Sequence, residues 1–354
     1  NGDGSWNPDL LGNHRAVIEF NGKGTVAKTT IEWRRRDENP EQKRIIVQDA
    51  KTGKDILNIK TENINRESGT VLFEPISGKG TYYVYYLPYI DEGPKVYYPK
   101  GVYAKPENTA DAGWLSKVKS NLKANCSVSE IQSVNEFNSF YPMEVIATTA
   151  ETQNIIAQNK GKAFLVFPED RMNSIRMQKD LPKRWIDKGV QNTFSDTALR
   201  GEYLAFQLGV YALQDLNNVK VTFSDLKNKD GKTIEAKNIS CINTDGVKYD
   251  GSLFSNTVNV SKGKIQAMWC GIDVPESTQA GEYFGKVLVS SGDATQEITL
   301  HLAVSEAVTH NGGIDHPEKM TRLKWLNSTM AQENTVIAPY TPLEVKESEI
   351  SLLG

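Results

Sequence analysis

The most constraining feature of this 354-residue chain is a series of short runs in which apolar and polar residues alternate between turn residues. Successive side chains of a strand point to opposite faces, so such runs predict half-buried strands. The first half contains RAVIEF, TVAKTTIEW, RIIVQDA, TVLFEPI and TYYVYYLPY. The second half contains EYLAFQLGVYAL, VKVTFSDL, KNISCINT, TVNVSKGKIQAMWCGIDVP, GEYFGKVLVSS and QEITLHLAVSEAV. We therefore expect a mainly all-β protein of antiparallel sandwiches with one or two short helices.

The length of the chain exceeds the usual single-domain size and favours two domains. We predict a first β-sandwich over residues 1–160 and a second, immunoglobulin-like one over residues 161–310, divided by the polar stretch AETQNIIAQNKGK. Residues 311–354 are expected to form an extended arm. A helix is predicted near residues 108–123, because apolar residues recur there at helical spacing.

Composition excludes several classes of partner. The net charge is −3, with basic and acidic residues interleaved, so the sequence has no signature of nucleic-acid binding. No apolar run approaches the roughly 18 residues of a membrane span. The four His residues are scattered without metal-ligand spacing, and we expect no metal and no cofactor. The first residues, NGDGSWNPDL, lack Met and a leader, which fits a mature exported form in the periplasm or on the outer surface.

The three cysteines leave two alternatives. Cys126, Cys241 and Cys270 can be small buried hydrophobes. Alternatively, Cys241 and Cys270 form a bridge between neighbouring strands while Cys126 stays free, which requires an oxidising compartment.

The stretch EWRRRDENPE is the first candidate for glycan contact. Arginine forks suit carboxylates and sugar hydroxyls, and an indole offers a stacking face, so the candidates are Trp33, Arg35, Arg36 and Asp37. The alternative is structural: arginines at a strand end commonly pair with neighbouring carboxylates.

The stretch FPEDR supplies two further candidates for glycan contact, Glu169 and Arg171. Paired carboxylates are what a glycoside hydrolase needs. However, adjacent strand residues such as Glu169 and Asp170 point to opposite faces, and the same holds for Asp37 and Glu38. We therefore favour a salt-bridged interface between the two domains for this region and nominate no catalytic residue. The sequence also contains no GxSxG motif and no Gly-rich phosphate loop.

The tyrosine-rich run predicts a strand that is covered on both faces. Tyr82, Val84 and Tyr86 point one way. Tyr83, Tyr85 and Leu87 point the other. One face belongs to the sandwich core, and the other packs against the helix, the second domain or a ligand.

Several stretches resemble a known family. The run IDVPESTQAGEYFGKVLVSSGDATQEITLHLAV is similar to the last strands of the β-sandwich that precedes the barrel in glycoside hydrolase family 123. Other stretches resemble the amino-terminal region of large secreted Bacteroidetes proteins of that type: LGNHRAVIEF, WRRRDENPE, GTYYVYYLPY, FPEDR, RGEYLAFQLGVYA and RLKWLNST...APYTPLEV.

The resemblance implies a non-catalytic N-terminal region of a secreted glycoside hydrolase that supports or extends a glycan-binding cleft. Residues 321–345 then lead toward a (β/α)₈ barrel in cis that this chain lacks, so we expect the chain to be inactive alone. The parent would act on N-acetylgalactosaminides, and its adjacent Asp-Glu catalytic pair would lie in the barrel. The Asp-Glu pairs of this chain, including Asp91-Glu92, stand in no comparable context. The alternatives are a stand-alone carbohydrate-binding protein and a purely structural or interaction module.

Overall fold

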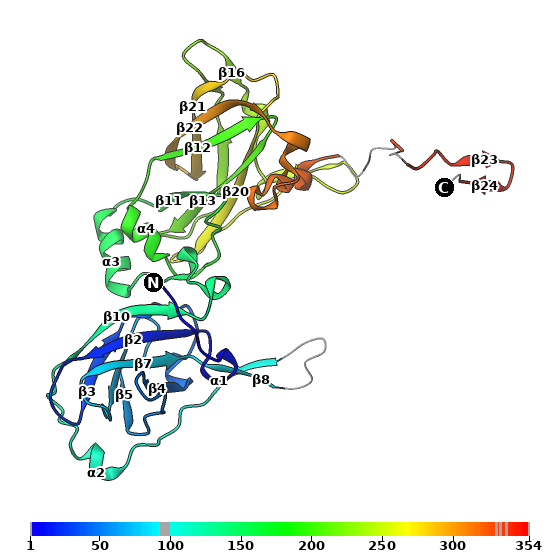
Figure 1. The fold of residues 1–354 in the computed structure, drawn as a ribbon. Coiled ribbons are helices and arrows are strands. Elements are labelled where there is room, and N and C mark those ends of the chain that lie inside the picture. Colours follow the sequence, from blue (N-terminus) through cyan, green and yellow to red (C-terminus); the bar gives the residue numbers. More distant parts are fainter. Residues whose placement is uncertain (1, 93–99, 330–331, 333–334, 337–338, 353–354) are drawn as a thin grey trace. The chain divides into compact units, whose positions relative to one another are not determined.

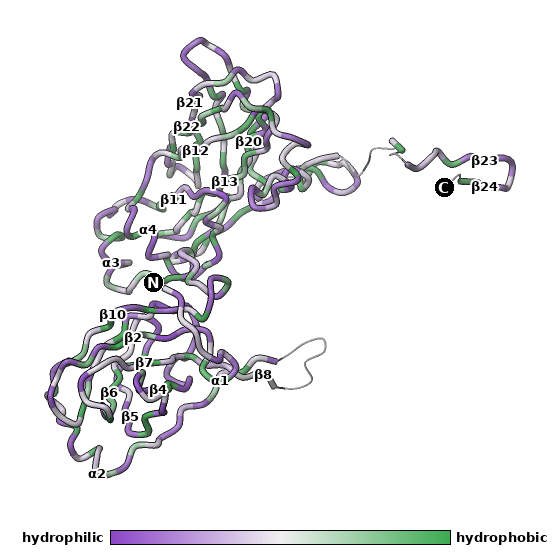
Figure 2. Tube along the Cα trace, in the orientation of Figure 1, coloured by the Kyte–Doolittle hydropathy of each residue, from purple (hydrophilic) through white to green (hydrophobic). Residues whose placement is uncertain are grey.

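The computed structural model describes residues 2–92, 100–329, 332, 335–336 and 339–352 and confirms the predicted mainly β fold (Figure 1). Two compact units account for its contacts. Unit 1 comprises residues 1–159 and 180–189, and unit 2 comprises residues 160–179 and 190–354. Hydrophobic residues concentrate along the strands of each unit, whereas the connecting loops are largely polar (Figure 2). Among the described residues, no helix has the length and apolar character needed to cross a membrane.

Unit 1 is a sandwich of two sheets. The five-stranded sheet has the order β1 (Gly2–Asp3), β10 (Cys126–Ser133), β2 (His14–Phe20), β7 (Gly80–Tyr86), β4 (Ile45–Asp49). The three-stranded sheet has the order β3 (Ala27–Ile31), β6 (Gly69–Phe73), β5 (Ile59–Glu62). All these pairings are antiparallel except β1 with β10. A separate hairpin joins β8 (Tyr89–Glu92) to β9 (Lys100–Tyr103). The side chains of Asp91 and Glu92 lie outside the described part.

Alternation places one face of each sheet in the core of unit 1. Ile18 and Phe20 of β2 pack with Val71 and Phe73 of β6, and all four are buried. Tyr82, Val84 and Tyr86 of β7 join the same core, as predicted. Burial of this apolar surface stabilises the pairing of the two sheets.

The outer face of β7 is covered by the first residues of the chain. The Arg15 guanidinium lies 3.6 Å from the Tyr83 ring centroid and 4.5 Å from that of Trp6, and it donates to the Tyr85 hydroxyl at 3.0 Å. The predicted outward position of Leu87 is wrong: its φ of 55° turns the chain, and the side chain joins the core.

The helices of unit 1 differ from the prediction. The region near residues 108–123 contains only α2 (Ala112–Leu115), capped by the Asp111 carboxylate. Trp114 of α2 is buried with Leu72, so a few apolar contacts, rather than a continuous helix, account for the helical spacing. The longest helix, α3 (Thr149–Gln158), lies in the polar stretch that we expected to be a boundary. The other helices are α1 (Pro8–Leu11), α4 (Lys183–Lys188) and the 3-10 turns η1 (Pro40–Gln42), η2 (Glu136–Asn138) and η3 (Pro142–Glu144).

Unit 2 also consists of two sheets around one core. The four-stranded sheet has the order β11 (Phe164–Asp170), β13 (Tyr203–Ala212), β20 (Ile265–Asp273), β17 (Ile239–Cys241). The six-stranded sheet has the order β12 (Thr193–Arg200), β22 (Ala294–Val308), β21 (Gly281–Ser291), β15 (Leu226–Lys227), β16 (Thr233–Ile234), with β14 (Lys220–Phe223) also paired to β21. Among the described strands of these two sheets, β12 with β22 is the one parallel pairing. A turn that contains Asp230 and Gly231 joins β15 to β16, and Gly231 supplies the positive φ of 75°.

The remaining elements of unit 2 are short. They are η4 (Ala236–Asn238), the hairpin β18 (Asp245–Val247) with β19 (Leu253–Ser255), η5 (His310–Gly313), η6 (Pro317–Lys319), η7 (Thr321–Asn327) and the hairpin β23 (Glu344–Lys346) with β24 (Glu349–Ser351). The sequence predicted an extended arm from residue 311, whereas residues 310–327 form 3-10 turns. Thr321 is buried and donates to the Gly313 carbonyl, and Lys324 pairs with Asp273 at 2.9 Å. Further on, the described side chains of the β23–β24 hairpin are exposed.

The sequence-based domain boundaries remain a prediction, because compact contacts alone do not establish independent folding. The chain passes between the two units three times, at residues 159–160, 179–180 and 189–190.

Candidate functional site

A pocket of about 560 Å³ opens in unit 1 and is the candidate site. Pockets of a few hundred Å³ are of the size that holds small ligands. Its walls combine the ring of Phe140 with cationic and anionic side chains from two parts of the chain. These charged side chains are Glu32, Arg34, Lys183, Arg184, Asp187 and Lys188.

Three extended segments bring these residues together. The Ile146 N–H donates to the Arg34 carbonyl at 3.1 Å, and Arg35 bridges to Val145. On the other side, the Lys183 N–H donates to the Val145 carbonyl at 2.8 Å. Segments near residues 34, 146 and 182 therefore run side by side, although about 150 positions separate the first from the last. Helix α4 begins directly after the third segment and forms one wall of the pocket.

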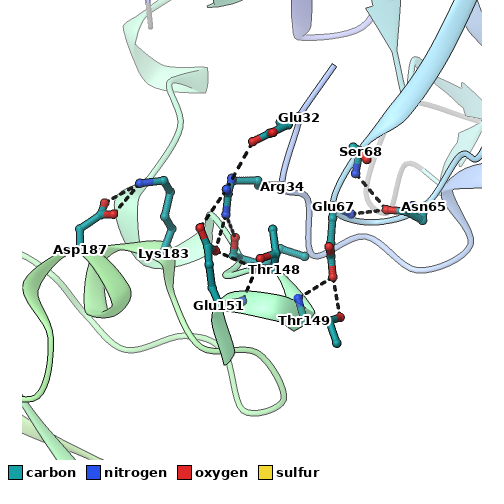
Figure 3. A network of polar contacts seen from close by, with 11 residues as sticks. Glu32, Arg34, Asn65, Glu67, Ser68, Thr148, Thr149, Glu151, Lys183 and Asp187 are labelled. Atoms are coloured by element: carbon teal, nitrogen blue, oxygen red, sulfur yellow. Dashed lines mark hydrogen bonds and ion pairs between the residues drawn. The ribbon is translucent and has the colours of Figure 1, made fainter. Parts of the chain in front are cut away.

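Arg34 is fixed beside the pocket by the start of α3 (Figure 3). Its guanidinium donates to both oxygens of Glu151, at 2.7 and 3.1 Å, and also contacts Glu32. Glu151 closes a capping box: it accepts from the Thr148 N–H at 2.8 Å while the Thr148 hydroxyl accepts from the Glu151 N–H. Glu67 adds a second anchor by accepting from the N–H and hydroxyl of Thr149. One carboxylate thus caps the helix and orients the arginine.

The stability of unit 1 should fall in acid through Glu151. The hydrogen bond from Arg34 outweighs burial and, with the Thr148 N–H, lowers the pKa of Glu151 from 4.5 to about 2. A depressed carboxylate pKa contributes stability above the unfolded pKa, and this contribution is lost as pH falls from about 4.5 toward 2. After discounting for solvent screening, we expect about 1–2 kcal/mol from this group.

Urea unfolding of the whole chain at pH 6 and pH 3 measures this contribution. The Glu151→Gln variant should lose less stability than the wild type between these pH values. Glu107→Gln, in an exposed pair with Arg44, is the matched control and should follow the wild type. Equal pH dependence of Glu151→Gln and the wild type would contradict the assignment.

Arg35 and Asp37 meet next to this pocket in a network with His14. Arg35 donates from Nε to the Asp37 carboxylate at 3.0 Å, and its Nη1 lies 2.9 Å from His14 Nδ1. The Tyr103 hydroxyl donates to the other Asp37 oxygen at 2.7 Å. Burial opposes ionisation of Asp37, but Arg35, Tyr103 and Lys43 outweigh it and lower the pKa.

His14 is neutral in this network at physiological pH. Burial, followed by the charge of Arg35, lowers the pKa of His14 to about 4. Arginine is always a donor, so Nδ1 accepts from Arg35 and Nε2–H donates to the Asn138 carbonyl at 2.7 Å. Its ring also packs on Phe140, with centroids 4.3 Å apart. This network therefore fixes the position of Phe140.

The remaining candidate residues near the strand end are occupied by structural contacts. Trp33 is only 3% exposed, donates from Nε1 to the Asn65 carbonyl at 2.7 Å and packs on Tyr86. Arg36 pairs with Glu144 at 2.9 Å. The three consecutive arginines thus engage three different carboxylates, which is the structural alternative raised by the sequence. Trp33 presents no exposed stacking face, and Phe140 is the pocket's partly exposed ring.

Glu169 and Arg171 belong to unit 2 and are described separately. Glu169 is buried in β11. Arg171 donates to Glu202 at 2.5 Å and to the Lys319 carbonyl at 3.3 Å. Glu202 also accepts from the Leu199 N–H. The Arg171–Glu202 ion pair therefore connects residues within unit 2.

Sequence reasoning missed His14, Phe140, Glu151 and the residues of α4. The Thr148–Glu151 spacing is a capping-box signal that was available in the sequence. Nothing in the sequence pattern places α4 beside Arg34. Within the described part of the chain, no group of three or more His, Cys, Asp or Glu side chains could hold a metal ion.

Residues 4–134 match the family model for the N-terminal domain of glycoside hydrolase 123. The predicted resemblance to the N-terminal region of family 123 glycoside hydrolases is therefore confirmed for these residues. The matched range contains Trp33, Arg35, Arg36 and Asp37. Comparison with curated proteins found no match.

Solved structures also resemble parts of the chain. A family 123 glycoside hydrolase from Clostridium perfringens aligns with 21% identity and a TM-score of 0.35, over 42% of this chain and 28% of that one. The CooA pilin subunit from enterotoxigenic Escherichia coli aligns with 14% identity and a TM-score of 0.23, over 40% of this chain and 99% of the pilin. The aligned part thus spans less than a third of the clostridial enzyme. Since these TM-scores are below 0.5, we draw no functional conclusion from them.

Proposed function

We propose that this chain is the non-catalytic N-terminal region of an exported glycoside hydrolase and supports or extends a glycan-binding cleft of a catalytic barrel in cis. The match of residues 4–134 to the glycoside hydrolase 123 N-terminal domain carries this proposal. The barrel would supply the catalytic carboxylates and act on N-acetylgalactosaminides, in the periplasm or on the outer surface. The internal pairing of the candidate Asp37 supports a non-catalytic role, because its carboxylate already accepts from Arg35.

Burial of the aromatic residues is further evidence for a non-catalytic, structural role. Trp33, Tyr82, Tyr85 and Tyr86 are each at most 3% exposed, so none offers a platform for sugar stacking. These side chains are instead buried in the packing of unit 1. Where the region extends the cleft of the complete enzyme, the described pocket is the favoured place for glycan contact, with Phe140 as the apolar surface and Lys183 and Arg184 as hydrogen-bond donors. Without the barrel, this contact should be too weak to detect.

The alternative function is a stand-alone carbohydrate-binding protein, and the pocket is the observation that favours it. A stand-alone carbohydrate-binding protein should show measurable glycan affinity with this chain alone, and Phe140→Ala should remove that affinity. Phe137, 95% exposed and three residues away, provides the matched control Phe137→Ala.

The test is to incubate the chain with oligosaccharides that include N-acetylgalactosamine-containing ones, following products by mass spectrometry and binding by ligand-observed NMR. A supporting region should release no product and give no binding signal by itself. Binding that Phe140→Ala removes and Phe137→Ala retains would establish the alternative function. Cleavage by the purified chain would overturn the non-catalytic role.

A further inference from the structure

Two cysteines face each other across neighbouring strands of unit 2. Cys241 ends β17, Cys270 lies in β20, and the antiparallel register sets them directly opposite. Both side chains are 2% exposed and belong to the same core cluster. Both are free thiols in this structure.

The hydrogen-bond pattern defines the type of site that the pair occupies. The Ile242 N–H donates to the Trp269 carbonyl at 2.9 Å, which places Ile242 and Trp269 at a hydrogen-bonded position of the ladder, while the Trp269 N–H donates to the Asn243 side chain. Hydrogen-bonded and non-hydrogen-bonded pairs alternate along an antiparallel ladder, which makes Cys241 and Cys270 a non-hydrogen-bonded pair. Opposite Cα atoms at such sites lie about 4.5 Å apart, within the range of about 4.4–6.8 Å that a disulfide spans. Both side chains point into the core, so both sulfur atoms lie on one face of the sheet.

We propose that Cys241 and Cys270 are a redox site that closes to a cross-strand disulfide through exchange with a small-molecule disulfide such as glutathione disulfide. One protein thiolate attacks the oxidant, forms a mixed disulfide and releases one glutathione. The second protein thiolate attacks the protein sulfur of the mixed disulfide and releases the other glutathione. In sum, two protein thiols lose two protons and two electrons, and one glutathione disulfide is reduced to two glutathione molecules.

The fold indicates which thiol reacts first. β17 has three residues and lies at the edge of its sheet, paired with β20, whereas β20 is held between β13 and β17. Short edge strands open at lower free energy than central ones, so Cys241 becomes accessible before Cys270. The hydrogen bond with Cys270 also lowers the pKa of the Cys241 thiol, while burial raises that of Cys270. Both effects make Cys241 the attacking group.

The test counts thiols in the whole chain before and after incubation with glutathione disulfide. Maleimide labelling in denaturant should find three thiols in the reduced chain and one in the oxidised chain, with Cys126 as the labelled residue. Closing a loop of about 30 residues should raise the Tm of unit 2 by roughly 7–14 °C. Limited labelling of the folded, reduced chain should modify Cys241 faster than Cys270.

Matched variants separate the pair from non-specific oxidation. Cys126→Ser should retain the Tm rise on oxidation, whereas Cys241→Ser should lose it. Three titratable thiols after prolonged exposure, or stable glutathione adducts on both cysteines, would overturn the proposal. If Cys241→Ser does not fold, the thiol count of the wild-type chain still decides the question.

Discussion

Replacing Trp33 with alanine should lower the free energy of unfolding of unit 1 by about 3–5 kcal/mol, because truncating a buried aromatic side chain leaves a cavity. The indole is held by Tyr86, with ring centroids 5.1 Å apart, and by its hydrogen bond to Asn65. Gly69 makes room for it: a Cβ added at Gly69 would lie 2.1 Å from the Trp33 ring. The surrounding strands are therefore shaped around this side chain and have little freedom to collapse into the cavity.

Urea unfolding of the whole chain followed by circular dichroism measures this loss. Phe137→Ala is the matched aromatic control. Because the Phe137 ring is exposed, this substitution should change the free energy of unfolding by no more than about 0.5 kcal/mol. If Trp33→Ala left stability unchanged while removing glycan binding, the side chain would be a ligand-contacting residue instead of part of the core.

Replacing Arg171 with methionine should lower the free energy of unfolding of unit 2 by about 3–5 kcal/mol, because it leaves the Glu202 carboxylate buried without its cation. The Glu202 side chain is only 1% exposed, and that of Arg171 is 11% exposed. Arg171 also donates to the Lys319 carbonyl, so the substitution should loosen residues 310–327 as well. Hydrogen exchange at the amides of η5 to η7 reports this second effect.

Lys286→Met is the matched control within the same unit. Lys286 pairs with Glu297 at 2.9 Å, but both side chains are more than half exposed. The substitution should therefore change the free energy of unfolding by less than about 1 kcal/mol. If Arg171→Met and Lys286→Met lowered the free energy of unfolding equally, burial of Glu202 would not increase the cost of losing its partner. Recovery of stability in the double variant Arg171→Met, Glu202→Leu would support the desolvation argument.

The strands were predictable because burial of one face imposes a period of two on the sequence. β13 and β21 lie within their predicted runs, whereas β2 and β22 begin one and two residues before theirs. β17 and β20 pair as neighbours, as a bridge between Cys241 and Cys270 requires. The short helices were not predicted well. Leu115, Val118 and Leu122 do pack against the cluster around Trp114, but through turns rather than one helix. Apolar spacing records which residues are buried and leaves the backbone between them undetermined.

The candidate site was only partly predictable for a different reason. Alternation and residue type identified Arg35 and Asp37, which do form a pair. The partners of Arg34 and Arg66 are Glu151 and Asp180, more than a hundred positions away. A charge pattern along the chain carries no information on contacts at this separation, because tertiary packing alone determines them. The neutral state of His14 likewise depends on burial that no local motif reveals.

The membership of residues 180–189 in unit 1 affects the order in which the protein can be completed during synthesis. Unit 1 lacks α4, its buried Trp185 and the Asp180 partner of Arg66 until these residues leave the ribosome. By then β11 has already emerged, while its partner strand β13 has not. A nascent chain therefore carries an unpaired, apolar β11 before either unit is finished. During that interval the exposed strand is prone to aggregate, and binding by a chaperone would prevent this.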